Sequence, residues 1–305
     1  MMKRLLAMTL LAAAANAADL QQQLEAIARQ HHGQVALYAR QLKTGAEVAI
    51  QADVPVQTAS VIKVPIMIEV FSQAKAGKLS LDERLVLTKE NQVPGSGILT
   101  NLQAGLQPTV LDAVTLMIDL SDNTATNLLI DRVGIAAVNA RIGVMGLKNT
   151  WLYKKVFKPA DGPMPADQKK FGLGKTTARE MAQALESIER CDLDDAALCK
   201  RMLDILKAQQ DHDEIPRYVQ FSDTSEKPSA IAHKTGALDA VRNDAGIVYT
   251  AAGPIVISAF TWDNQDHKWT ADNEADLTIA RLAKAIVDAW APKSAKPEPA
   301  KPAAP

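Results

Sequence analysis

The 305-residue sequence has little of several features that would assign it to a class at once. It contains two cysteines and 4% aromatic residues, and its formal net charge is −1. Two cysteines make a zinc site improbable, and a balanced charge gives no reason to expect nucleic acid as a partner. No stretch reaches the roughly 20 apolar residues that span a bilayer. The sequence therefore predicts no metal, no cofactor, no nucleic acid and no membrane span.

The two cysteines, Cys191 and Cys199, leave two states open. On one unbroken helix they would lie about 12 Å apart, at 1.5 Å per residue, which is beyond the Cα reach of a disulfide. Asp192, Leu193 and Asp194 could break that helix and bring the pair together. A disulfide and two free thiols are both compatible with the sequence.

Both ends of the chain differ in composition from its middle. Residues 1–17 combine an early Lys3-Arg4 pair, an apolar run and an Ala15-Asn16-Ala17 pattern, as in a secretory signal peptide with its cleavage site. Residues 291–305 contain only Ala, Pro, Lys, Ser and Glu, a composition that cannot build a packed core and predicts a disordered tail. We expect an exported protein, periplasmic or extracellular, whose catalytic unit spans residues 18–290.

Hydrophobic periodicity places strands toward both ends of this unit and helices in its middle. The strand-like runs are residues 34–41, 47–52, 230–233, 246–250 and 255–262. The helical patterns are residues 19–30, 61–76, 110–120, 125–133, 135–144, 177–188 and 276–290.

The simplest packing of these elements is an α/β (α+β) fold. One antiparallel sheet is flanked by the N- and C-terminal helices, and an all-helical lobe is inserted into it. The sheet lobe takes in about residues 18–59 and 213–290, and the helical lobe about residues 60–212. We expect a single unit and a monomer.

A hydroxyl and an amine lie three residues apart in the motif Ser60-Val61-Ile62-Lys63, where a helix that is apolar nearly all round begins. Residues at that spacing share a helix face, and such a helix is buried. A lysine can activate a serine only if desolvation or other cations lower its pKa, and burial supplies the desolvation. The alternative is a helix-capping serine followed by a lysine that extends to solvent.

The second motif, Ser121-Asp122-Asn123, lies between two helical patterns. All three residue types suit a helix N-cap, which is one interpretation. The other is a loop that presents a hydroxyl for proton relay to a leaving group and an amide for holding a substrate.

The third motif, Lys234-Thr235-Gly236, follows a strand-like run and precedes Ala237. A cation and a hydroxyl there can bind a substrate carboxylate, and glycine permits close backbone approach. An edge strand would also offer free N–H groups to a substrate and to an oxyanion. The alternative is an edge-strand lysine followed by a turn.

In this order the three motifs resemble the set typical of class A β-lactamases and penicillin-binding proteins. Their joint occurrence by chance is at about the one-in-a-thousand level. Flanking segments, among them 94–99 and 124–129, are also similar to that family. The resemblance extends from about residue 19 to residue 290.

The resemblance implies a role for each motif residue. Ser60 would be acylated with the help of Lys63, and the N–H groups of Ser60 and Ala237 would form the oxyanion hole. Ser121 would relay a proton, and Asn123 would hold the substrate amide.

The carboxylate of the substrate would bind Lys234 and Thr235, with Gly236 beside them. Arg242 is a candidate second anchor for that carboxylate, and a structural ion pair is the alternative for it.

One departure from the family concerns the loop of residues 151–175. Family members that hydrolyse β-lactams carry a glutamate there, which activates the water that releases the acyl group. This loop contains no Glu, and its only carboxylates are Asp161 and Asp167. Asp161 is the candidate replacement base, although its side chain is one methylene shorter. Losing a positioned base costs about 10²- to 10⁴-fold in rate, so acylation could survive while deacylation is slow.

Three functions are compatible with these residues. The first is a β-lactam-hydrolysing enzyme, the second a penicillin-binding D,D-carboxypeptidase acting on peptidoglycan stem peptides, and the third a covalent β-lactam sensor that stays acylated. A Ser–His–Asp triad through His233 is disfavoured, because the sequence assigns no acid to that histidine.

Overall fold

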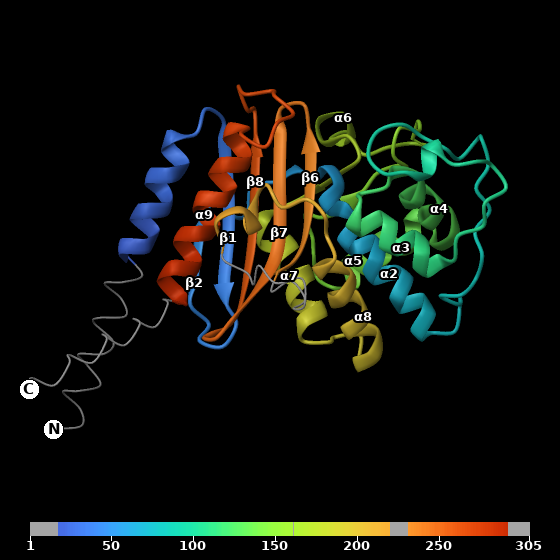
Figure 1. Ribbon diagram of the computed structural model, residues 1–305, viewed down its shortest axis with the longest axis horizontal. Helices are drawn as coiled ribbons and strands as arrows, with labels where there is room; N and C mark the ends of the chain where they lie inside the picture. The colour runs from blue at the N-terminus through green and yellow to red at the C-terminus, as the bar shows by residue number, and fades with distance from the viewer. Residues whose placement is uncertain (1–17, 161, 220–230, 292–305) are drawn as a thin grey trace, which may run out of the picture.

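The computed structural model describes residues 18–160, 162–219 and 231–291, and its centre is a five-stranded sheet with strand order β2-β1-β8-β7-β6 (Figure 1). All neighbouring strands run antiparallel, which confirms the predicted sheet. The strands are β1 (Gln34–Gln41), β2 (Glu47–Ile50), β6 (Ile231–Leu238), β7 (Val241–Thr250) and β8 (Gly253–Trp262). The predicted signal peptide and residues 292–305 of the predicted tail lie outside the described residues.

Side chains alternate between the two faces of the sheet, as the two-residue period of a strand requires. On β8, Ile255 and Ile257 pack into one hydrophobic cluster, whereas Val256 and Phe260 pack into another. Both faces of the sheet are therefore buried, and each needs its own helical cover.

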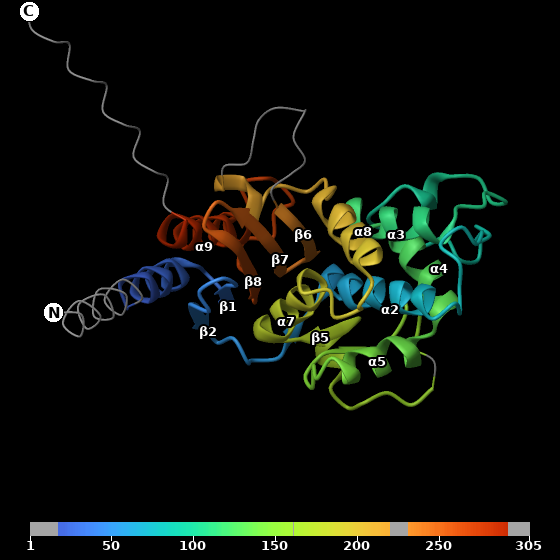
Figure 2. The same ribbon diagram turned by 90° about the horizontal axis from the view of Figure 1, so that it is seen from below.

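The two terminal helices cover the first face. The N-terminal helix, of which residues 18–30 are described, lies beside α9 (Glu274–Trp290), as Figure 2 shows. Leu24 of the first helix and Ile279 and Leu282 of α9 are fully buried in the same cluster as Ile257. The two ends of the folded unit are thus held on one side of the sheet, as predicted.

The helical lobe covers the other face and is built around one buried helix. Its helices are α2 (Lys63–Lys75), α3 (Val110–Asp119), α4 (Asn123–Val133), α5 (Ile135–Val144), α6 (Gln168–Phe171), α7 (Ala178–Glu189) and α8 (Ala196–Lys207). Every residue of α2 from Lys63 to Ser72 is buried. This confirms the apolar helix, whereas α8 was not predicted.

The inserted lobe is not wholly helical, which corrects one part of the predicted description. A small three-stranded sheet joins β3 (Val56–Gln57), β5 (Gly174–Thr176) and β4 (Trp151–Leu152) in that order. Strands of two or three residues are too short to show an alternating pattern, so the sequence carries no signal for them.

The cysteines form a disulfide. The helix α7 ends at Glu189, and the chain then turns with positive φ at Cys191 and Asp194 before α8 begins. This break brings the Cα atoms of Cys191 and Cys199 to 5.5 Å, within disulfide reach. Of the two states that the sequence left open, the structure has the bonded one.

Candidate active site

Ser60 lies on the short 3₁₀ helix η1 (Ala59–Ile62), directly before α2. Its neighbours Ala59 and Val61 are buried, while Ser60 itself is partly exposed. Ala59 has a φ of +43°, a conformation that costs a non-glycine residue about 1 to 3 kcal/mol. The strained turn presents the Ser60 hydroxyl to solvent from an otherwise buried helix.

The amine of Lys63 lies at the centre of the site. Its Nζ is 3.0 Å from Ser60 Oγ, 2.7 Å from Ser121 O, 3.0 Å from Ser121 Oγ and 3.0 Å from Asn123 Oδ1. The side chain is fully buried. Burial, and secondarily the positive charge of Lys234, hold the pKa of Lys63 well below its ordinary value, so the neutral amine is favoured.

The partners of this amine fit a neutral base. A neutral amine has two N–H donors and one lone pair. Ser121 O and Asn123 Oδ1 can only accept, so they take the two donors, and the lone pair remains for a hydroxyl proton. The Asn123 amide is oriented for this because its Nδ2 donates to Pro94 O at 3.1 Å. Lys63 is therefore placed to take the proton of Ser60.

The loop around Ser121 is held by Asp122, one of the three residues for which the sequence offered a helix cap. The carboxylate of Asp122 accepts the N–H groups of Ile98, Leu99 and Ala125 at 2.7 to 2.8 Å. It caps α4 and ties this loop to the segment that follows Pro94. Ser121 itself has a φ of +53°. The predicted helix cap and the predicted site thus coexist in one tripeptide.

The third motif lies on β6, the edge strand of the sheet. Gly236 lies against the backbone of the nucleophile turn, because a methyl group on it would stand 2.9 Å from Ser60 N, 3.0 Å from Thr58 O and 3.0 Å from Val61 N. Only glycine permits this approach.

The N–H group of Ala237 faces the open edge of the sheet. Residues opposite one another in an antiparallel pair alternate between hydrogen-bonded and non-bonded. Arg242 stands opposite Ala237, and its N–H donates instead to Thr261 Oγ1 on β8. Ala237 N–H therefore points away from β7, beside Gly236 and Ser60, where it can serve an oxyanion.

Lys234 is fully buried behind this edge, and its Nζ donates to Thr235 O at 2.8 Å. Burial lowers the pKa of Lys234 to about 8, against the opposing effect of the carboxylates of Asp211, Asp244 and Glu214. Lys234 is therefore mostly charged at neutral pH, unlike the favoured state of Lys63.

His233 has a carboxylate partner that the sequence did not assign. Its Nδ1 lies 3.1 Å from both carboxylate oxygens of Asp244, and both side chains are buried. Asp244 also accepts the N–H of Ile215 at 3.0 Å. The side chain that contacts Ser60 Oγ is Lys63, and the contacts of His233 to Asp244 do not extend to Ser60, so no Ser–His–Asp triad is formed among the described contacts.

Arg242 is engaged in structural contacts. Its Nε lies 3.5 Å from Asp276 Oδ1, its Nη2 donates to Lys268 O, and its guanidinium packs 4.4 Å from the ring of Trp269. Only 3% of the residue is exposed. The geometry favours the ion-pair alternative over a free carboxylate anchor.

The loop of residues 151–175 approaches the site with apolar side chains. Asn127, one helical turn after Asn123, clamps Val156: its Nδ2 donates to Val156 O at 2.9 Å and its Oδ1 accepts Val156 N–H at 2.8 Å. A methyl group on Gly95 would stand 3.1 Å from Phe157 Cε2 and would also contact Asn123. Phe157, Gly95 and Asn123 are therefore close neighbours. The sequence did not single out Val156 or Phe157.

Of the two loop carboxylates, only Asp167 belongs to the residues that the structure describes. Asp161 lies outside the described residues. Asp167 accepts from Lys175 Nζ at 2.6 Å and from the Tyr153 hydroxyl at 2.8 Å. The hydrogen bond from Lys175 holds the pKa of Asp167 below its usual range, which makes it a weak base.

A cavity of about 340 Å³ opens above Ser60. Predicted site residues Ser121, Thr235, Gly236 and Ala237 line it together with Ser60. Asp119, Asp211 and Trp269 also line it and were not predicted, since they come from segments with no motif.

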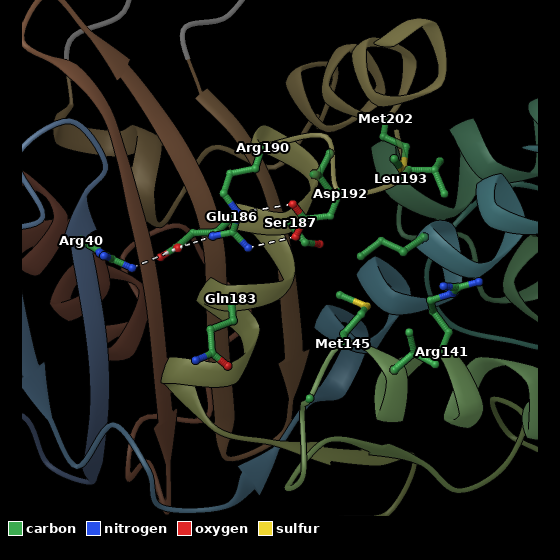
Figure 3. A pocket seen from close by; sticks show the side chains of 14 residues that line it. Arg40, Arg141, Met145, Gln183, Glu186, Ser187, Arg190, Asp192, Leu193 and Met202 are labelled. Carbon is green, nitrogen blue, oxygen red and sulfur yellow. Dashed lines mark hydrogen bonds and ion pairs between the residues drawn. The ribbon is translucent and has the colours of Figure 1, made fainter. Parts of the chain in front are cut away.

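A second cavity, of about 510 Å³, lies between α5, α7 and α8 (Figure 3). Arg40 and Arg190 on its wall both pair with the buried Glu186, at 3.4 and 3.0 Å. It contains none of the motif residues, so the nucleophile belongs to the smaller cavity. Within the described ranges no group of histidine, cysteine and acidic side chains could hold a metal ion, and no helix is long and apolar enough to cross a membrane.

Comparisons with known proteins agree with the family resemblance of the three motifs. The family model described as the β-lactamase enzyme family matches residues 19–290. A β-lactamase from Sphaerobacter thermophilus has 31% sequence identity and a TM-score of 0.76, covering 90% of this chain and 97% of its own. PBP-A has 26% identity and a TM-score of 0.74, with coverage of 89% and 96%.

Two further solved structures extend this likeness. A PBP-A mutant in an acyl-enzyme complex with penicillin G has 26% identity and a TM-score of 0.74, covering 90% of this chain and 96% of its own. An ancestral class A β-lactamase shares the fold, with 24% identity, a TM-score of 0.76 and coverage of 89% and 100%.

The contact between Gly236 and the Ser60 turn predicts an effect on stability. Gly236→Ala would place its methyl group against three backbone atoms and should lower the free energy of unfolding by about 1 to 3 kcal/mol. Gly143→Ala is the matched control: its methyl group meets nothing within 4 Å in α5 and should be neutral or stabilise by up to about 1 kcal/mol. Urea unfolding measures both, and equal stability of the two variants would contradict the close contact.

Proposed function

The chain belongs to the β-lactamase enzyme family, and on that premise we propose that it is a serine hydrolase that forms an acyl-enzyme on Ser60 with β-lactams or D-Ala-D-Ala-like peptides. The observation that carries the proposal is the buried Lys63 amine, 3.0 Å from Ser60 Oγ and supported by two acceptor-only oxygens. This is the arrangement that an activated serine requires.

In the proposed acylation, Ser60 Oγ attacks the carbonyl carbon of the substrate amide while the Lys63 amine takes the hydroxyl proton. The N–H groups of Ser60 and Ala237 stabilise the oxyanion that forms on the carbonyl oxygen. As the C–N bond breaks, the proton passes from Lys63 through the Ser121 hydroxyl to the leaving nitrogen. The Nζ–Oγ distance of 3.0 Å between Lys63 and Ser121 supports this relay.

Substrate binding is assigned to the remaining motif residues. Asn123 would hold the substrate amide, and Lys234 with Thr235 would bind its carboxylate. Arg242 would take part only if it were released from Asp276. We also infer export, from the pattern of residues 1–17, and a monomer.

Deacylation is the step that separates the candidate functions. The loop presents Val156 and Phe157 where a water-activating carboxylate would be needed, so we propose a long-lived acyl-enzyme with β-lactams. This favours the D,D-carboxypeptidase, or a covalent sensor, over a fast β-lactamase. The likeness to PBP-A supports the penicillin-binding alternative, and the mutant of PBP-A captured as an acyl-enzyme with penicillin G supports the acylation step. The identity of 31% to a β-lactamase favours β-lactam hydrolysis as the second candidate.

Intact mass measurements on the protein mixed with penicillin G test the nucleophile and the release step together. The wild type should gain the mass of one penicillin and lose it slowly. Ser60→Ala should gain none because it lacks the attacking oxygen, whereas Ser96→Ala, a serine of the same cavity, should still be labelled. A folded wild type that gains no mass would sink the acyl-enzyme proposal. Rapid gain and loss would instead identify a β-lactamase.

Val156→Glu is expected to supply the missing base. Its backbone is already clamped to Asn127, so the new carboxylate would extend from a fixed point near Asn123. Loss of the penicillin adduct should accelerate by about 10²- to 10⁴-fold. Val156→Gln has the same length without the charge and should release the adduct at the wild-type rate. Equal release by the two variants would place the base site elsewhere.

The pKa of Lys234 predicts a decline in acylation at alkaline pH. The ammonium binds the substrate carboxylate only while charged, so the second-order rate constant of acylation should fall as the pH rises through about 8. The slope should approach about tenfold per pH unit. Lys234→Arg stays charged throughout this range and should lose the decline, even if its rate at pH 7 is lower. A profile for Lys234→Arg that still falls near pH 8 would assign the decline to another group.

A further inference from the structure

The loop that borders the candidate active site carries a concentrated positive charge. Residues 148–175 contain seven lysines and two aspartates, with no Arg or Glu, a formal charge of +5 in a chain whose total is −1. The rest of the chain therefore has a net negative charge, opposite in sign to the charge of this segment. The proposed reaction uses none of these lysines.

The structure folds the two limbs of this segment together. Trp151 pairs with Lys175 across β4 and β5, and the Tyr153 N–H donates to Leu173 O at 2.9 Å. The Asp167 carboxylate bridges Tyr153 and Lys175. The lysines thus belong to one folded loop, which in Figure 2 runs along the helical lobe past α5.

Most of these lysines have no acidic partner. Lys155 pairs with Asp131 at 2.8 Å, and Lys175 pairs with Asp167. The other five form no ion pair with any described residue. They are Lys148, Lys154, Lys158, Lys169 and Lys170. Lys154 and Lys158 donate to backbone carbonyl oxygens, whereas Lys148, Lys169 and Lys170 are exposed, so the charges of these three are accessible to a ligand.

The loop also reaches the mouth of the candidate site. Val156 is clamped to α4, the helix that begins at Asn123, and Lys158 Nζ donates to Glu90 O at 2.8 Å, just before the segment that holds Asn123. Phe157 is 63% exposed at the same place. One lysine of the loop, Lys158, is thus held close to the segment that positions Asn123.

We propose that this lysine loop, residues 148–175, is a docking surface for an anionic polymer, the carboxylate-bearing peptidoglycan whose stem peptides the Ser60 site would cleave. The inference rests on the proposed function and deepens it by naming a polymeric substrate. Lysines are flexible point charges that suit a diffuse array of anionic groups, whereas arginine, which the loop lacks, suits bidentate recognition of a single carboxylate or phosphate. Clustered charge of one sign raises the local concentration of such a ligand.

Co-sedimentation of the full chain with purified peptidoglycan sacculi tests the surface. Wild type should bind more at about 50 mM than at about 500 mM salt, because salt screens exposed charges. Lys169→Glu with Lys170→Glu should weaken binding by at least about fivefold at low salt. Lys43→Glu with Lys78→Glu reverses two exposed lysines outside the loop that also form no ion pair with the described residues, and should bind like wild type.

The outcomes separate the surface from the chemistry. Equal weakening by both double variants, or none by the loop variant, would overturn the docking surface. Binding of anionic phospholipid vesicles in preference to sacculi would also overturn it, in favour of a membrane. Penicillin labelling of each variant reports on its Ser60 site. Penicillin labelling without salt-dependent sedimentation would support the proposed function and overturn the docking surface. Salt-dependent sedimentation without labelling would support the docking surface and overturn the acyl-enzyme.

Discussion

The buried amine of Lys63 is the constraint on which the rest of the site depends. A charged amine in that position would lack both water and a contacting carboxylate, so its surroundings favour the neutral form and must supply acceptors for its two N–H groups. Ser121 O and Asn123 Oδ1 do so, and both are positioned by the loop that Asp122 ties to the segment after Pro94. The lone pair that remains is directed at the Ser60 hydroxyl, on which the proposed acylation rests.

A second buried lysine, Lys234, has different neighbours, which oppose the lowering of its pKa. The carboxylates of Asp211, Glu214 and Asp244 raise the pKa of Lys234 against the effect of burial. With a pKa of about 8, Lys234 is mostly charged at neutral pH. Its charge in turn lowers the pKa of Lys63. Two lysines with separated pKa values can divide base chemistry and anion binding between them, as pairs of titratable groups do in other active sites.

The loop of residues 151–175 explains why membership of one family is compatible with two activities, β-lactam hydrolysis and D,D-carboxypeptidase activity. The proposed acylation residues come from η1, α2, the turn that begins α4, and β6, which pack against one another. The deacylation residue would come from a loop, where one substitution changes the outcome without disturbing the core. Here that loop is clamped to α4 at Val156 and exposes lysines, on which the proposals of a long-lived acyl-enzyme and of a docking surface rest.

The sequence by itself determined the motifs and most of the elements, but not α8 or the short strands β3, β4 and β5. The apolar helix after Ser60, the hairpin of β1 and β2, the antiparallel sheet and the edge position of Lys234 all follow from local periodicity and spacing, which neighbouring residues carry. The tertiary structure decided the pairings between distant segments: Asn127 with Val156, His233 with Asp244, Arg242 with Asp276 and the closure of the disulfide. Such contacts depend on how separate elements pack, and no local pattern records them. For the same reason the spacing of the first motif identified Ser60 and Lys63, whereas only the packing around them showed which oxygens accept from the Lys63 amine.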